Sequence, residues 1–330
     1  MNITHGTINV DVLRGKVDEE NEIWGHRGDD DIRGGKLDDA IIGGKGDDKL
    51  WGDRGNDKII GDSGNDTLWG SVDDDRVFGG IGNDVLYGGK GDDALHGGKD
   101  NDTLAGNSGD DAMIGGLGDD VLMGQRGNDV MFGGRGNDKL IAGSGDDFVM
   151  ASSGNDSYSG GAGFDTLDFS RMVGKVSIDL GHHWAKVGSG HAVAENFVSG
   201  FEQVIGSDAG NHFMGDRSST AFIGGKGDDW FRGKLGADVL TGGEGSDTFA
   251  WLKKDLADGS VDTVADFQVG VDRLDLTDFL KGHTSYGNVL KVAHDGQDTT
   301  LQGLVKGQWV DVVHLQGVEA NTLADLGILA

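Results

Sequence analysis

The sequence predicts an all-β protein, a right-handed parallel β-roll of nonapeptide rows with a C-terminal β cap. Three observations support this prediction. Residues 25–168 repeat every nine residues without interruption, 63 of the 330 residues are glycine, and an apolar residue recurs at one fixed place in each row. A repeat of this regularity indicates a solenoid of stacked units, so it has to be interpreted before any single motif.

Sixteen consecutive rows follow the template Gly-Gly-x-Gly-(Asn/Asp)-Asp-x-U-x, in which U is apolar. The glycines permit positive φ angles, so the first six residues can form a tight turn. The last three residues are expected to form a short strand whose middle side chain points inward. Two rows would form one coil, and stacked coils would bury the U side chains between two parallel sheets. Eight coils would extend for roughly 38 Å.

The sixth place of every row is aspartate. Rows on the same side of the roll are two apart, so these carboxylates would form two ladders. Like charges ~4.8 Å apart repel by about 3–4 kcal/mol per neighbour at an effective dielectric constant near 20. Because one apolar residue per row does not offset that cost, the ladders require a cation, and carboxylates with backbone carbonyls suit Ca²⁺ better than Mg²⁺. The sixth-place residues are Asp30, Asp39, Asp48, Asp57, Asp66, Asp75, Asp84, Asp93, Asp102, Asp111, Asp120, Asp129, Asp138, Asp147, Asp156 and Asp165.

This pattern resembles the RTX (repeats-in-toxin) calcium-binding nonapeptide proteins, whose motif is Gly-Gly-x-Gly-x-Asp-x-U-x. The resemblance implies that each Ca²⁺ lies between two turns on one edge of a parallel β-roll. It also implies that the sixth-place aspartates and carbonyls of the Gly-rich segment are the ligands. The alternative is a metal-free array of solvated Asp-Gly loops. Rows depart from the motif at Leu37, Asp73 and Asp100 in the fourth place and at Ala142 and Ala151 in the first place, and the sites beside Leu37 are the most affected.

The segments around this block have different predicted roles. Residues 1–24 are expected to form an N-terminal cap with one degenerate row, so little room remains before it for a catalytic domain. Residues 169–205 break the nine-residue rhythm and are expected to form a spacer of longer strands that continues the roll. Residues 206–250 form five further rows. Their sixth places are Asn211, Thr220, Asp229, Asp238 and Asp247, of which only the three aspartates are expected to bind calcium.

Residues 251–330 contain fewer glycines and more β-branched residues. They resemble the end segment of type I secreted RTX proteins, which implies an uncleaved export signal read by the type I secretion apparatus. The segment can also serve as a β cap that protects the open end of the roll. In the spacer, His182, His183 and His191 are expected to be exposed loop histidines, because no cysteine or carboxylate lies at ligand spacing.

Composition limits the partners. The formal charge is −29, which argues against nucleic acid and against simple electrostatic docking on anionic membranes. The chain has no cysteine, so bound metal has to replace the stabilisation that disulfides or a large core would supply. Without calcium, low hydrophobicity and high net charge are typical of disorder. The chain has neither an apolar run of membrane-spanning length nor an ordinary signal peptide.

The ninth place of the rows should point outward but is largely apolar. Such ladders could contact a second copy, a glycan or a membrane. Strand propensity alone, or coverage by residues 169–250, would also explain them. On one face the ninth-place residues are Trp51, Trp69, Tyr87, Ala105, Met123 and Ile141, and on the other they are Ile42, Ile60, Phe78, His96, Ile114, Phe132 and Met150.

The sequence contains neither a Gly-x-Ser-x-Gly elbow nor a His-Glu-x-x-His motif, so we expect a non-enzymatic protein. The resemblance implies export in an unfolded state and folding on extracellular calcium, with sites in the range of roughly 10⁻⁴–10⁻³ M. The architecture resembles that of the nodulation-type secreted calcium-binding proteins of rhizobia, which implies action at a cell surface or host membrane. A structural matrix or adhesin component is the alternative, and an accessory module of a calcium-dependent polysaccharide-active enzyme is a third possibility.

Overall fold

The computed structural model describes residues 1–189, 192–283, 285–294 and 296–328. Two compact units make up the chain, Met1–Leu167 and Asp168–Ala330. The prediction made for His191, and the part of the export signal at residues 329–330, lie outside the described residues.

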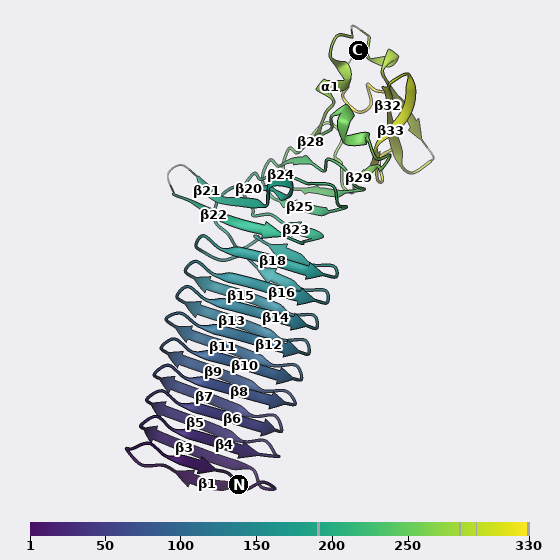
Figure 1. Ribbon diagram of the computed structural model, residues 1–330. Helices are drawn as coiled ribbons and strands as arrows, with labels where there is room; N and C mark the ends of the chain where they lie inside the picture. Colours follow the sequence, from purple (N-terminus) through teal and green to yellow (C-terminus); the bar gives the residue numbers. More distant parts are fainter. Residues whose placement is uncertain (190–191, 284, 295, 329–330) are drawn as a thin grey trace. The chain divides into compact units, whose positions relative to one another are not determined.

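In the first unit, two parallel sheets take alternate strands (Figure 1). One sheet contains β1 (Asn2–His5), β3 (Asn21–Arg27), β5 (Ala40–Lys45), β7 (Lys58–Ser63), β9 (Arg76–Ile81), β11 (Ala94–Lys99), β13 (Ala112–Leu117), β15 (Val130–Arg135) and β17 (Phe148–Met150). The other contains β2 (Val12–Arg14), β4 (Asp31–Gly35), β6 (Lys49–Arg54), β8 (Thr67–Val72), β10 (Val85–Lys90), β12 (Thr103–Ser108), β14 (Val121–Arg126), β16 (Lys139–Ser144) and β18 (Ser157–Ala162). Strand β19 (Thr166–Asp168) spans the boundary between the units.

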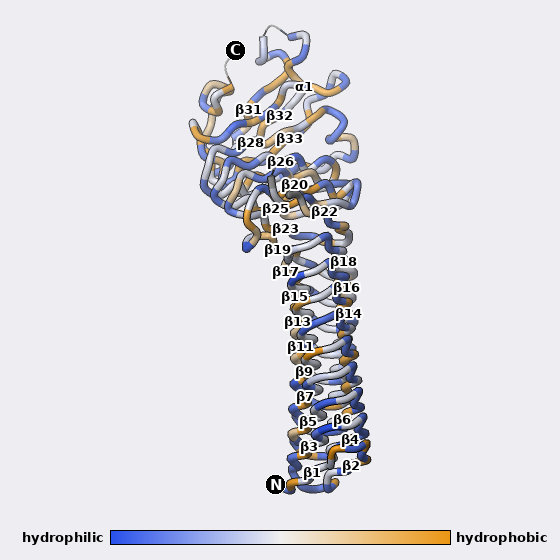
Figure 2. Tube along the Cα trace, turned by 90° about the vertical axis from the view of Figure 1, so that its left-hand side faces the viewer, coloured by the Kyte–Doolittle hydropathy of each residue, from blue (hydrophilic) through white to orange (hydrophobic). Residues whose placement is uncertain are grey.

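The pairing register confirms a coil of two rows. Leu50 of β6 pairs with Leu68 of β8, and Leu86 of β10 pairs with Leu104 of β12, in each case eighteen residues later. The eighth-place side chains form the core between the sheets, from Ile32 to Leu167, and none is more than 2% exposed. Hydrophobic residues therefore recur from coil to coil along the first unit (Figure 2).

The strands are longer than the sequence analysis expected. A strand such as β10 runs from the seventh place of one row to the third place of the next, so the turn shrinks to the fourth, fifth and sixth places. The first three places were wrongly assigned to the turn. The second-place residue is able to remain in the sheet at positive φ, as Gly89 does when it pairs with Ser71 and Asn107.

The N-terminal cap follows the same plan with one extra residue. β1 pairs with β3 at a separation of nineteen residues (Asn2 with Asn21), and β2 pairs with β4 at the same separation (Val12 with Asp31). The additional residue that the sequence shows between the degenerate row and the first complete row is thus accommodated in a loop, and the register of eighteen begins after it.

The second unit also contains two sheets, but each combines parallel and antiparallel strands. One contains β23 (Gln203–Ile205), β25 (Ala221–Gly225), β27 (Val239–Gly243), β29 (Asp262–Val264), β33 (Gln308–Leu315), β32 (Thr299–Val305) and β31 (Leu290–His294). The other contains β22 (Ala192–Ser199), β21 (Trp184–Ser189), β20 (Val176–Asp179), β24 (His212–Met214), β26 (Trp230–Arg232), β28 (Thr248–Ala250) and β30 (Arg273–Asp275). The helices are η1 (Leu180–His182), η2 (Lys253–Leu256), α1 (Thr277–Leu280) and η3 (Tyr286–Asn288).

The spacer differs from the expected continuation of the roll. β20 pairs with β24 in the parallel sense, as a coil requires, but β21 and β22 are antiparallel to their neighbours and form an inserted hairpin. The five rows after it stack as predicted, with their eighth-place side chains fully buried. Three of these form a stack, Phe213 to Phe231 at 5.0 Å and Phe231 to Phe249 at 5.1 Å between ring centroids. Among the described residues, no helix is long and apolar enough to cross a membrane.

Candidate calcium-binding ladders

The sixth-place aspartates form two hydrogen-bonded ladders in the first unit. From Asp39 onward, the Oδ1 atom of each accepts a hydrogen bond from the backbone N–H of the sixth-place residue eighteen positions earlier. Asp30 Oδ1 accepts the N–H of Asp11, nineteen positions earlier. Asp66 N donates to Asp84 Oδ1 at 2.8 Å, and Asp84 N donates to Asp102 Oδ1 at 2.8 Å. The first ladder comprises Asp30, Asp48, Asp66, Asp84, Asp102, Asp120, Asp138 and Asp156, and the second comprises Asp39, Asp57, Asp75, Asp93, Asp111, Asp129, Asp147 and Asp165.

The second carboxylate oxygen has a different environment. For the fourteen aspartates from Asp30 to Asp147, Oδ2 is buried and accepts no hydrogen bond from the described residues. These residues are at most 3% exposed. Asp229, Asp238 and Asp247 of the second unit share both properties. Because a buried carboxylate oxygen without a partner is costly, such a row of oxygens indicates that a cation completes it.

The pKa values of the ladder aspartates reflect the same cost of burying a charged carboxylate. Burial raises the pKa of Asp57, Asp66 and Asp102 from 3.8 to about 8, although the backbone N–H bond to each carboxylate acts in the opposite direction. Neighbouring carboxylates raise these pKa values further. Without metal, the ladders would therefore bind protons near neutral pH instead of remaining ionised. A divalent cation would remove the need for these protons.

The rest of each cradle comes from the backbone. A Cβ added to Gly61, the first-place glycine, would collide with Asp66 Oδ2 and with the carbonyl oxygen of Gly79 in the next coil. The Oδ2 atom of the row's own aspartate is the nearest atom at every first-place glycine from Gly25 to Gly133, and a carbonyl oxygen of the next coil is also close in more than half of these rows. Among the described residues, no three His, Cys, Asp or Glu side chains converge on one point. Carbonyl oxygens would therefore supply the remaining ligands, and this donor set fits Ca²⁺.

Asp156 is the exception in the first ladder. Its Oδ2 accepts a hydrogen bond from the hydroxyl of Tyr158 at 2.6 Å and lies 3.3 Å from Ser152 Oγ. The Tyr158 hydroxyl in turn accepts the backbone N–H of Ser152 at 3.0 Å. Tyr158 is the eighth-place residue of its row and is fully buried. The Tyr158 hydroxyl is thus the partner of Asp156 Oδ2, whereas a cation would be the partner of Oδ2 in the other rows. Asp156 is therefore the weakest of the predicted ligands.

Amide side chains stand at the start of two ladders. The Nδ2 atom of Asn21 donates to the carbonyl oxygens of Lys16 and Glu19 and to Asp39 Oδ1. In the second unit, Asn211 Nδ2 donates to the carbonyl oxygens of Ser207 and Gly224. Because an amide nitrogen satisfies carbonyls without a metal, these two positions do not require calcium. For Asn211 this arrangement supports the expectation that its row has lost its ligand.

Two aspartates beyond the nonapeptide rows continue the ladders of the second unit, and the sequence analysis missed them. Asp238 N donates to Asp262 Oδ1 and Asp247 N donates to Asp272 Oδ1, both at 3.0 Å. Asp262 Oδ2 accepts the indole N–H of Trp251 at 2.7 Å, so this carboxylate oxygen has a protein partner. The separations are 24 and 25 residues instead of eighteen, so the nine-residue period could not reveal these positions.

The departures from the motif have local effects. Asp73 and Asp100 adopt the positive φ of the glycines they replace, at 80° and 73°. Next to Leu37, Asp39 remains 3% exposed and keeps its bare Oδ2, so the ladder continues past the atypical turn. Ala142 places a methyl group where Gly61 has none, although Asp147 Oδ2 accepts no hydrogen bond from the part of the chain that the structure describes. Ala151 is the first residue of the row in which the Tyr158 hydroxyl donates to Asp156.

The histidines of the spacer differ from the simple expectation. His182 is exposed, but its Nδ1 lies 2.7 Å from Oδ2 of the buried Asp179, three residues earlier. The expectation that no carboxylate lay within reach was therefore wrong. His183 is exposed at the end of η1 with φ 58° and packs against Phe197.

The outward ninth-place ladder of the first unit is ordered by stacking. The Trp51 and Trp69 rings are parallel within 2° at 4.6 Å, and Tyr87 continues the stack at 5.8 Å. The Arg33 guanidinium lies 4.6 Å from the Trp51 ring centroid. Both faces of the Trp51 and Trp69 rings and one face of the Tyr87 ring are thus covered, so this part of the ladder presents mainly ring edges outward.

Comparison with known proteins agrees with this geometry. The RTX calcium-binding nonapeptide repeat (4 copies) family matches residues 18–41, 33–68, 69–104, 105–140 and 132–167. The peptidase M10 serralysin C-terminal family matches residues 158–306. No curated protein sequence matches the chain significantly. The repeats bind calcium ions, and proteins built from them are typically secreted by type I systems. With its nonapeptide repeats followed by a serralysin-type C-terminal region, the chain belongs to the RTX calcium-binding proteins.

Proposed function

We propose that the chain is a non-enzymatic secreted protein that folds when extracellular calcium fills its aspartate ladders. The observation that supports this proposal is that the Oδ2 atoms of the aspartates from Asp30 to Asp147 are buried and accept no hydrogen bond from the described residues. A chain that buries so many carboxylates without counter-charge is unstable at neutral pH, and the cradles do not exist before the coils form. Calcium would therefore bind and fold the protein in one linked process, and calcium-poor cytosol would keep it unfolded for export.

The test is far-ultraviolet circular dichroism of the purified protein at pH 7.5 during a calcium titration. We expect a coil spectrum in chelator and a cooperative gain of β signal in roughly the 10⁻⁴–10⁻³ M range of extracellular sites. Magnesium at the same concentrations is the control and should be much less effective. A full β spectrum in excess chelator would contradict the proposal. Fractionation of the producing culture would show separately whether the protein leaves the cell.

We propose further that the folded protein acts at a cell surface or host membrane through its ninth-place ladders. The stack of Trp51, Trp69 and Tyr87 supports a contact of this kind, because its edges form a continuous apolar strip. The covered ring faces make stacking against a sugar ring less favourable than contact with lipid or a second copy. A matrix or adhesin role would use the same strip for self-association.

Leakage of dye-loaded vesicles and analytical ultracentrifugation, both with calcium, separate these roles. Replacing Trp51, Trp69 and Phe132 with serine should abolish leakage or self-association while leaving the calcium-induced β spectrum intact. Leakage supports the membrane role, and inert vesicles with concentration-dependent association support the structural role. If the wild-type protein shows neither, the surface role is wrong. Activity on a panel of polysaccharides would support the third possibility, a part in a calcium-dependent polysaccharide-active enzyme.

A further inference from the structure

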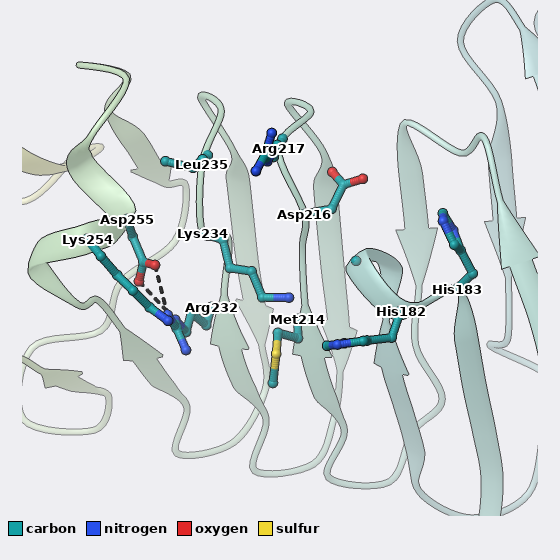
Figure 3. A pocket seen from close by; sticks show the side chains of 11 residues that line it. His182, His183, Met214, Asp216, Arg217, Arg232, Lys234, Leu235, Lys254 and Asp255 are labelled. Atoms are coloured by element: carbon teal, nitrogen blue, oxygen red, sulfur yellow. Dashed lines mark hydrogen bonds and ion pairs between the residues drawn. The ribbon is translucent and has the colours of Figure 1, made fainter.

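The second unit contains a pocket of about 560 Å³ in which basic side chains outnumber acidic ones. This is unusual in a chain with a formal charge of −29. The lining comes from the spacer, from the rows after it and from η2 (Figure 3). The basic lining residues are His182, His183, Arg217, Arg232, Lys234 and Lys254.

Two buried carboxylates fix part of this basic lining. Asp255 is 4% exposed and accepts hydrogen bonds from Arg232 Nε and Nη2, both at 2.8 Å. Asp179 is 5% exposed and accepts Lys234 Nζ at 3.0 Å, with His182 Nδ1 at 2.7 Å. Burial would raise the pKa of Asp179, but the bonds from His182 and Lys234 lower it below its usual value. The Asp179 carboxylate is therefore ionised and holds its cations in place. The two hydrogen bonds from Arg232 to Asp255 fix the position of that guanidinium group.

Lys234 occupies a place at which the motif has glycine. It is the second residue of its row and has φ 79°, a conformation that disfavours any side chain. The side chain nevertheless extends into the pocket, where its ammonium group and the His182 ring point toward each other (Figure 3). Lys234 is half-buried and forms an ion pair with the buried Asp179, which links β20 to the turn after β26. The pair offsets the backbone strain and keeps one cation of the pocket in a fixed position.

Two further cations are available to a ligand. Arg217 and Lys254 are exposed, and neither forms an ion pair within the described part of the chain. Asp216 and Asp255 line the pocket and Asp179 pairs with Lys234. The four lysines and arginines outnumber these three carboxylates, so the formal charge is positive without any contribution from the histidines. Met214 and Leu235 add apolar surface to the lining.

We propose that this pocket binds an oxyanion carried by a sugar-sized ligand, either a carboxylate or a sulfate. The pocket lies within the volume range of small-molecule sites. Guanidinium and ammonium groups form charge-assisted hydrogen bonds with both oxyanions. Arg232 and Lys234 are already oriented by their buried partners, and Arg217 and Lys254 supply the uncompensated charge.

The test is isothermal titration of the full-length, calcium-loaded protein with glucuronate, glucose 6-sulfate, inorganic sulfate and glucose. The test variant combines Arg217→Ser with Lys254→Ser, which leaves both buried ion pairs intact. The matched control combines Lys49→Ser with Lys58→Ser, which removes the same charge from exposed places in the first unit. The circular dichroism spectrum with calcium confirms that each variant folds.

We expect glucuronate or glucose 6-sulfate to bind and glucose not to bind. The double substitution at Arg217 and Lys254 should weaken binding at least tenfold, and the control should change it by less than twofold. Tight binding of inorganic sulfate alone would identify the free anion as the ligand, because the sugar would then contribute nothing. Equal losses in both variants, no loss in either, or no binding by wild-type protein would overturn the proposal.

Discussion

Asp84 and Asp156 provide a matched pair for testing what the Oδ2 atoms do. Both belong to the first ladder, and the Oδ1 of each accepts a backbone N–H at 2.8 Å. Asparagine retains an oxygen for that bond, so Asp→Asn changes little besides the second oxygen and the charge. At Asp84 the second oxygen is bare, whereas at Asp156 it is bonded to the Tyr158 hydroxyl.

The two substitutions should therefore have different costs. At a calcium concentration 100 times the dissociation constant, one bound ion contributes about 2.7 kcal/mol to stability, and Asp84→Asn should lose about that much. Asp156→Asn replaces a charge-assisted hydrogen bond with a neutral one, so its cost should be about 1 kcal/mol. The number of bound ions should fall for the first variant and remain at the wild-type value for the second.

Urea unfolding at fixed free calcium measures the stabilities, and elemental analysis of gel-filtered protein measures the bound calcium. Unfolding of a solenoid can proceed in stages, so the calcium count is the primary result and the urea midpoints support it. If Asp156→Asn loses as many ions as Asp84→Asn, Tyr158 does not replace a cation. If Asp84→Asn loses none, the bare oxygen is not a ligand.

Three further predictions concern the same structure. In decalcified protein the pKa of Asp57 is raised by burial from 3.8 to about 8, so its contribution to stability is present at low pH and disappears as the pH rises through about 8. The β signal should therefore be larger at pH 5.5 than at pH 8.5, with light scattering to detect precipitation near the isoelectric point of 4.4, and identical coil spectra would contradict this reasoning. Gly61→Ala should displace Asp66 Oδ2 and lower calcium affinity, whereas Gly287→Ala, which meets no atom within 4 Å, should not; equal affinities in titration calorimetry would refute the cradle. Phe231→Ala, at the centre of the phenylalanine stack, should cost about 3–5 kcal/mol in urea unfolding with calcium, and a loss below 1 kcal/mol would show that the stack is not a packed core.

The repeat made most of the first unit predictable. A period of nine residues, with Leu50 and its equivalents at one place, indicated inward side chains, coils of eighteen residues and two aspartate ladders, and the structure has all three. Local propensity did not define the ends of the strands, because glycine permits both turn and sheet. The pairing of Gly89 with residues of the adjacent coils decides that it belongs to the sheet.

The features that the sequence analysis missed depend on contacts outside the period. Tyr158 fits the apolar place of its row, and only the structure shows its hydroxyl on Asp156. Asp262 and Asp272 lie off the period, because the chain makes longer excursions before it returns to the ladders. The pocket in the second unit combines lining residues from Gly181 to Asp255, so no local pattern could indicate it.

The register of eighteen has a consequence for how the first unit can change its length. Removing eighteen residues from its middle, for example 67–84, would leave every later strand in its own sheet and every later aspartate on its own edge, because each coil contacts equivalent neighbours. Removing nine residues would transfer all later strands to the opposite sheet. The ninth-place ladder of Trp51 and Trp69 would then continue with the ninth-place residues that now follow Phe78 on the other face. Gene duplications and deletions that preserve both faces are therefore restricted to whole coils, so natural length variants of such a roll should differ by even numbers of rows.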